Sequence, residues 1–89
     1  MVIGGTRPGA VTGETAVLDA SGTATFSWSA SDARADDIYS VERSDTGKVT
    51  EVSETSIDLS DATSDLCITV TVLRDGEQDS DPTRWCIQG

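Results

Sequence analysis

Short runs in which apolar and polar residues alternate recur along the chain, with turn-forming clusters between them. In residues 23–29, Ala24, Phe26 and Trp28 share one face, and the residues between them carry hydroxyl groups. Residues 66–73 show the same period of two, which is typical of a strand with one buried face. The pattern predicts strands at residues 14–18, 23–29, 37–43, 48–52, 56–59, 66–73 and 83–88.

This succession of short strands, with weak helix signals, predicts an all-β fold: a seven-stranded antiparallel β-sandwich. The 89 residues suffice for one domain and are too few for two. We expect residues 1–13, which include Gly4, Gly5 and Pro8, to form a flexible linker or tail, and residues 14–89 to form the sandwich. The first residues lack the basic and apolar regions of a signal peptide, so we interpret the chain as a fragment excised from a longer protein.

The four aromatic residues all fall at positions expected to face inward. A domain of this size has a small core, so it should place nearly all its large side chains inside. The inward-facing aliphatic residues of the third and sixth predicted strands complete the set. The predicted core comprises Phe26, Trp28, Tyr39, Val41, Leu66, Ile68, Val70, Val72 and Trp85.

The two cysteines, Cys67 and Cys86, lie on the last two predicted strands, each between residues that face the core. Both thiols should therefore point outward from the same sheet, on neighbouring strands about 5 Å apart, a distance that a disulfide spans. We expect a Cys67–Cys86 disulfide on the outer face of one sheet, rather than across the sandwich, in an oxidising compartment. The alternatives are two unrelated thiols in a reducing compartment, or a metal site. A metal site would need further ligands, and the chain has no histidine.

Acidic residues outnumber basic residues by 16 to 6, which gives a formal charge of −10. Such a field repels phosphate backbones and anionic lipids, so we expect no nucleic acid partner. No run of residues approaches the roughly 20 apolar residues of a membrane span, so we expect no direct membrane insertion. The charge favours solubility, and we expect a monomer in isolation. It permits a basic partner or a cation.

Several segments resemble the fibronectin type III family: Phe-Ser-Trp at 26–28, Tyr-Ser-Val-Glu-Arg at 39–43 and Leu-Cys-Ile-Thr-Val-Thr-Val at 66–72. The resemblance covers nearly all of residues 10–89 and implies an immunoglobulin-like sandwich in which Trp28 is the buried core tryptophan. The family usually has a tyrosine where Leu66 stands, and the tyrosine hydroxyl ties down the preceding corner. We expect the disulfide to replace that tie in part.

The cysteine arrangement is similar to a variant found in modules of actinobacterial secreted and receptor-like proteins, including serine/threonine kinases. This likeness implies an extracellular or extracytoplasmic location, at the cell surface or in secreted form. The integrin-type Arg-Gly-Asp tripeptide is absent from the sequence, so cell adhesion by that route is not indicated.

The sequence contains no recognisable catalytic set. Histidine, the commonest general base and the usual partner of Ser and Cys nucleophiles, is missing. Two carboxylates can hydrolyse glycosides, but a small sandwich offers no deep cleft for a sugar. We therefore expect neither an enzyme nor a bound cofactor.

Acidic residues gather in the loops after the second and sixth predicted strands, which lie at the same end of the sandwich in the resembling fold. Together they could chelate Ca²⁺, which takes six to eight oxygen ligands. The candidate ligands are Asp32, Asp36, Asp37, Asp75, Glu77, Asp79 and Asp81. The alternative, which we favour, is a pair of solvated loops that bind no metal.

Three functions fit these observations. The leading one is a non-catalytic extracytoplasmic interaction or spacer module of a larger cell-surface or secreted protein, with a protein as partner. The second is a ligand- or Ca²⁺-sensing extracellular domain of a membrane receptor such as a serine/threonine kinase. The third is an accessory carbohydrate-binding module of an exported hydrolase, which would need an exposed planar aromatic side chain.

Overall fold

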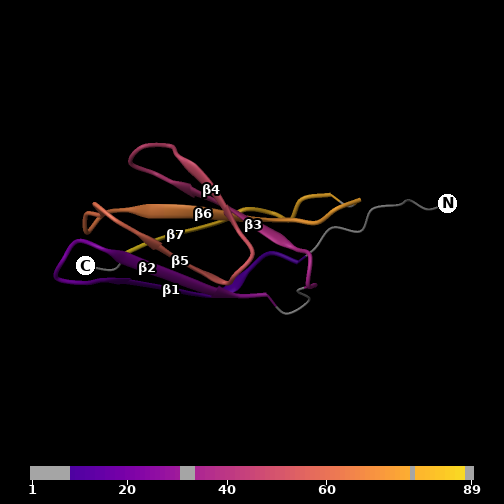
Figure 1. Ribbon diagram of the computed structural model, residues 1–89, viewed down its shortest axis with the longest axis horizontal. Coiled ribbons are helices and arrows are strands. Elements are labelled where there is room, and N and C mark those ends of the chain that lie inside the picture. Colours follow the sequence, from indigo (N-terminus) through magenta and orange to yellow (C-terminus); the bar gives the residue numbers. More distant parts are fainter. Residues whose placement is uncertain (1–8, 31–33, 77, 88–89) are drawn as a thin grey trace.

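The computed structural model describes residues 9–30, 34–76 and 78–87. Its strands are β1 (Thr12–Leu18), β2 (Ala24–Ser29), β3 (Ile38–Arg43), β4 (Val49–Val52), β5 (Ser56–Leu59), β6 (Cys67–Leu73) and β7 (Thr83–Cys86). They form two antiparallel sheets in separate layers, with the orders β1–β2–β5 and β4–β3–β6–β7 (Figure 1). The predicted seven-stranded antiparallel sandwich is confirmed. Within the described ranges, no helix is long and apolar enough to cross a membrane.

The first strand begins earlier than expected. β1 starts at Thr12, and Val11 just before it is only 3% exposed and belongs to the core. Gly13 has a φ of 63° and lies at an irregularity in the β1–β2 pairing, a conformation that glycine adopts readily. This bulge interrupts the alternation, so the pattern alone suggested a start at residue 14. The sandwich therefore includes part of the expected linker, of which residues 1–8 lie outside the described ranges.

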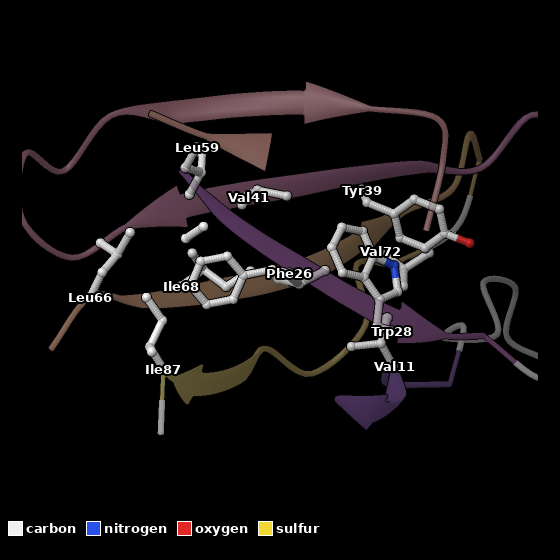
Figure 2. Close-up of a cluster of buried hydrophobic side chains, with 12 residues drawn as sticks. Val11, Phe26, Trp28, Tyr39, Val41, Leu59, Leu66, Ile68, Val72 and Ile87 are labelled. Atoms are coloured by element: carbon white, nitrogen blue, oxygen red, sulfur yellow. The ribbon is translucent and has the colours of Figure 1, made fainter. Parts of the chain in front are cut away.

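The other strands agree with the sequence pattern to within two residues at each end. The core lies between the two sheets, and Figure 2 shows side chains from both sheets meeting there. Eight of the nine predicted core residues are buried; the ninth, Trp85, is half-buried and packs against the rest. The structure adds Val11, Ala24, Leu59 and Ile87 to this core.

Edge-to-face contacts connect the aromatic rings. The Trp85 ring lies 6.1 Å from Phe26 and 6.0 Å from Trp28, and the Trp28 ring lies 5.5 Å from Tyr39. Such contacts contribute about 0.5–1.5 kcal/mol each beyond the burial of their area. Four aromatic side chains therefore form one continuous cluster that joins the two sheets.

The corner before β6 is held without a tyrosine. Leu66 is 1% exposed and packs in the core. Its N–H donates to the carbonyl of Thr63 at 3.1 Å, and its own carbonyl accepts from the N–H of Ile87 at 3.0 Å. The Thr63 hydroxyl donates to the carboxylate of Asp65. Local hydrogen bonds and pairing with the chain after β7 thus fix this corner.

The cysteines are bonded as predicted. Cys67 and Cys86 lie directly opposite each other in the β6–β7 pair. Their neighbours Ile68 and Ile87 belong to the core, so the disulfide lies on the outer face of the four-stranded sheet. Ser44 extends the connection to the end of β3, because its hydroxyl accepts from the Cys67 N–H at 3.0 Å and its own N–H donates to the Cys67 carbonyl at 2.9 Å.

Replacing Cys67 and Cys86 together with alanine is expected to lower the free energy of unfolding by about 3 kcal/mol. The reason is that the bond closes a loop between cysteines 19 residues apart and so restricts the unfolded chain. Urea denaturation with and without a reductant measures the effect. The reductant should shift the midpoint of the wild type and leave that of the double variant unchanged. Equal midpoints for the wild type and the double variant in the absence of reductant would contradict a stabilising role.

Candidate ligand-binding cleft

A cleft of about 420 Å³ opens on the outer face of the four-stranded sheet, where β3 begins and β6 ends. Ile38 and Leu73 face each other across the β3–β6 pair and are both half-buried. The next residues, Tyr39 and Val72, are buried in the core, so Ile38 and Leu73 point to the opposite side of the sheet. They give the cleft an apolar floor.

Acidic side chains line the rest of the cleft. Asp36 precedes β3, Glu51 comes from β4, and Asp75 and Asp79 come from the β6–β7 connection. All four residues are exposed. In the part of the chain that the structure describes, none of these four carboxylates forms an ion pair or a side-chain hydrogen bond. The cleft therefore combines an apolar floor with four carboxylates available to a ligand.

Arg74, at the edge of the cleft, forms a buried ion pair with Asp37. Its Nε donates to Oδ1 at 2.8 Å and its Nη2 donates to Oδ2 at 2.7 Å. The two side chains are only 5% and 1% exposed. The backbone N–H of Arg34 also donates to Oδ2, at 3.0 Å. Because the Arg74 charge is matched by Asp37, it does not offset the four carboxylates of the cleft.

The ion pair changes the titration of Asp37. The hydrogen bonds from Arg74 lower the pKa of this carboxyl below its ordinary value of 3.8, and they outweigh burial, which alone would raise the pKa. Asp37 therefore stays ionised at neutral pH. Bidentate pairing of this kind also fixes the direction of both side chains.

The strand register explains how this pair forms. The last residue pair of β3 and β6 is Ile38 opposite Leu73, so Asp37 and Arg74 occupy the next position beyond it. Sequence reasoning missed the pair, because it assigned Asp37 to the calcium site and Arg74 to a loop. The available signal was the pair of opposite charges at facing ends of two strands that the resembling fold places side by side.

The described residues contain no group of three or more His, Cys, Asp or Glu able to hold a metal ion, so the candidate calcium ligands among them do not meet in one site. Asp37 is engaged by Arg74 instead, through both carboxylate oxygens. Asp32 and Glu77 lie outside the described residues. The remaining candidates divide between two places: Asp36, Asp75 and Asp79 line the cleft, and Asp81 does not.

None of the four aromatic rings, all within the described ranges, is exposed as a flat platform. Phe26, Trp28 and Tyr39 are buried. The Trp85 ring packs against Phe26 and Trp28, and its Nε1 donates to the carbonyl of Thr15 at 3.0 Å. The aromatic side chains therefore stabilise the sandwich and do not present a sugar-stacking surface.

The sheet order distinguishes this sandwich from an immunoglobulin constant domain. In that domain the fourth strand joins the sheet of the first, second and fifth strands. Here β4 pairs with β3. Domains d3–d4 of the rat CD45 extracellular region are similar to this chain, with a TM-score of 0.73 and 18% identity. The fold is fibronectin type III-like.

The CD45 likeness covers 91% of this chain and 49% of the other, so the chain spans about half the length of that CD45 fragment. A structure described as a myokine has a TM-score of 0.53 and 18% identity, and the likeness covers 90% of this chain and 97% of the other. At these identities the likeness shows the fibronectin type III-like fold alone. No family model and no curated protein sequence matches the chain.

Asp37→Asn is expected to lower the free energy of unfolding by about 3–5 kcal/mol, because the buried Arg74 would keep its charge and lose the carboxylate that pairs with it through both oxygens. Asp36→Asn, at the exposed neighbouring position, should change it by less than about 0.5 kcal/mol. The double variant Asp37→Leu with Arg74→Met removes both charges and should recover most of the loss. Urea denaturation of the three proteins tests this, and a fully stable Asp37→Asn variant would contradict it.

Stability should also fall in acid. Since the folded pKa of Asp37 lies below its ordinary value of 3.8, its stabilising contribution is complete above about pH 5 and is lost as the pH falls through the folded pKa. The Ser21 hydroxyl lowers the pKa of Asp19, and Arg43 lowers that of Asp45, so both act in the same direction. Unfolding free energies measured from pH 6 to 2 should decline less steeply for Asp37→Asn than for the wild type. Parallel curves would exclude Asp37 as a contributor.

Proposed function

We propose that this chain is a non-catalytic interaction module of a protein that acts outside the cytoplasm. The observation that carries the proposal is the cleft on the outer sheet face, where an apolar floor adjoins four carboxylates that have no side-chain partner among the described residues. Such a combination of buried apolar area and polar rim is typical of contact surfaces between proteins. The nearby sheet face supplies a rigid support for it.

The surface next to the cleft extends the area available for contact. Val49, Glu42, Thr69 and Arg84 lie in register and form one row across β4, β3, β6 and β7. Val49 is 53% exposed, which makes it one of two large apolar side chains exposed among the described residues. A row of apolar and charged side chains of both signs on a sheet is suited to a protein partner with matching groups.

An extracytoplasmic location is supported by the Cys67–Cys86 disulfide, since such bonds persist in oxidising compartments. The similar CD45 structure is that of an extracellular region. The carbohydrate-binding alternative has less support, because the aromatic rings pack inside the sandwich. Calcium sensing has less support because Asp37 is held by Arg74.

A photo-crosslinking residue placed at Glu51 tests the interaction. It is expected to capture a discrete partner from the surface or medium of cells that produce this protein. The matched position is Thr25, which is exposed on the outer face of the three-stranded sheet. Thr25 should give no such product. No product from either position would indicate a spacer, and equal capture at both would contradict the assignment of the contact to the cleft face.

The location has its own test. In protein recovered from the same cells, Cys67 and Cys86 should resist thiol alkylation until a reductant is added, because they are bonded to each other. Denaturing the protein before alkylation separates a bonded cysteine from one that is merely buried. Alkylation of both cysteines without reductant would contradict an oxidising compartment.

A further inference from the structure

The cleft at the β3–β6 end has a specific distribution of charge. Its four acidic side chains contribute −4, and the charges of Arg74 and its partner Asp37 cancel, so the residues that line the cleft, taken with Asp37, sum to −4. The whole chain carries −10, so no distant excess of positive charge offsets this field. A ligand of the cleft must therefore be cationic.

The shape of the cleft decides between kinds of cation. A metal ion requires several oxygen ligands converging on one point, and the described residues contain no group that could hold one. The cleft instead spreads its carboxylates around Ile38 and Leu73, over a volume of about 420 Å³. A hydrated ion would bury no apolar area against this half-buried floor. The aliphatic stem of a long basic side chain would bury apolar area there while its charged end reached the carboxylates.

Among basic side chains, arginine matches the cleft best. Its guanidinium has five donors in a planar fork and can pair with several carboxylates at once, whereas the lysine ammonium is a compact and strongly hydrated point charge. Because the guanidinium is more weakly hydrated than an ammonium, less free energy is needed to desolvate it when it lies over Ile38 and Leu73. Carboxylates on different elements, Asp36, Glu51 and Asp79, would then receive its donors from different sides.

We propose that this cleft binds an arginine side chain within a basic segment of a partner protein. The arginine stem lies on Ile38 and Leu73, and its guanidinium pairs with the surrounding carboxylates. The buried Arg74–Asp37 pair holds the edge of the cleft in place and is not consumed by the ligand. This inference rests on the proposed interaction function and names the chemistry of the partner.

A titration of the isotopically labelled chain with the peptide acetyl-Gly-Arg-Gly-Arg-Gly-amide, followed by amide NMR shifts, tests the inference. We expect saturable shifts centred on Ile38, Leu73 and Asp75, with a dissociation constant below about 1 mM that rises with salt. The peptide with citrulline, the neutral isostere of arginine, should not bind. The lysine peptide should bind at least about threefold more weakly. If either the citrulline peptide or the lysine peptide bound as tightly as the arginine peptide, the assignment would be overturned.

Paired variants separate the cleft from the general acidity of the chain. Glu51→Gln with Asp79→Asn should weaken the arginine peptide about three- to tenfold. Glu14→Gln with Asp58→Asn makes the same change of charge on the three-stranded sheet and should alter affinity less than about twofold. An equal loss in both double variants would show that only net charge matters and would overturn the proposal.

A titration with calcium tests the other kind of cation that an acidic cleft could bind. Adding about 5 mM CaCl₂ at constant ionic strength should leave the cleft amides unshifted and the peptide affinity unchanged. Saturable shifts that displace the peptide would replace the arginine site with a metal site. If the peptides fail to bind while a residue at Glu51 still crosslinks a partner, the arginine assignment is wrong and the interaction function stands. If both fail, the interaction function is wrong as well.

Discussion

The pairing of β3 with β6 is the constraint on which the rest of this structure depends. It runs over six residue pairs, from Ile38 opposite Leu73 to Arg43 opposite Ile68, and lies at the centre of the four-stranded sheet. β4 and β7 join its two sides. A shift of one residue would exchange the two faces of a strand. Tyr39 would then point to solvent, and the floor of the cleft would point into the core.

The Asp37–Arg74 pair acts on this register. It occupies the position just beyond the last β3–β6 pair, where both side chains are almost fully buried. Buried ion pairs add little net stability compared with apolar residues of the same size, but a shifted register would leave one charge buried alone, at a much larger cost. We interpret the pair as a device that specifies one register. The same geometry neutralises Arg74 and so leaves the cleft acidic.

The alternation of apolar and polar residues predicted most strands and which face each side chain occupies. It predicted little of what depends on contacts between distant segments. The strand around Trp28 alternates without interruption. The strands of Cys67 and Cys86 are also regular, so the alternation of side chains along them predicts that both thiols point outward. Gly13 breaks the alternation, so the pattern does not predict the first two residues of β1 or the burial of Val11. The resemblance to fibronectin type III domains predicted a sandwich of that type, and the structure confirms a fibronectin type III-like fold.

The cleft was beyond the reach of sequence patterns for a physical reason. Its lining comes from three separate segments: the start of β3, the middle of β4 and the connection after β6. Spacing along the chain does not show that Glu51 and Asp79 share a cleft. The acidic loops are recognisable from the sequence as a charged region, but the burial of Asp37 depends on Arg74, 37 residues away, which the pattern places in a loop.

The disulfide also determines how the domain would respond to mechanical tension. When the chain is pulled from both sides, force passes from Cys67 directly to Cys86 through the covalent bond, and residues 68–85 carry none of it. Even if all strands came apart, this segment would stay a closed loop. The extended chain would be shorter by roughly 60 Å, because 19 residue steps of about 3.3–3.6 Å are replaced by a bridge of about 5 Å. Asp75 and Asp79 lie within that loop, so half of the acidic rim of the cleft belongs to a segment that tension along the chain cannot stretch.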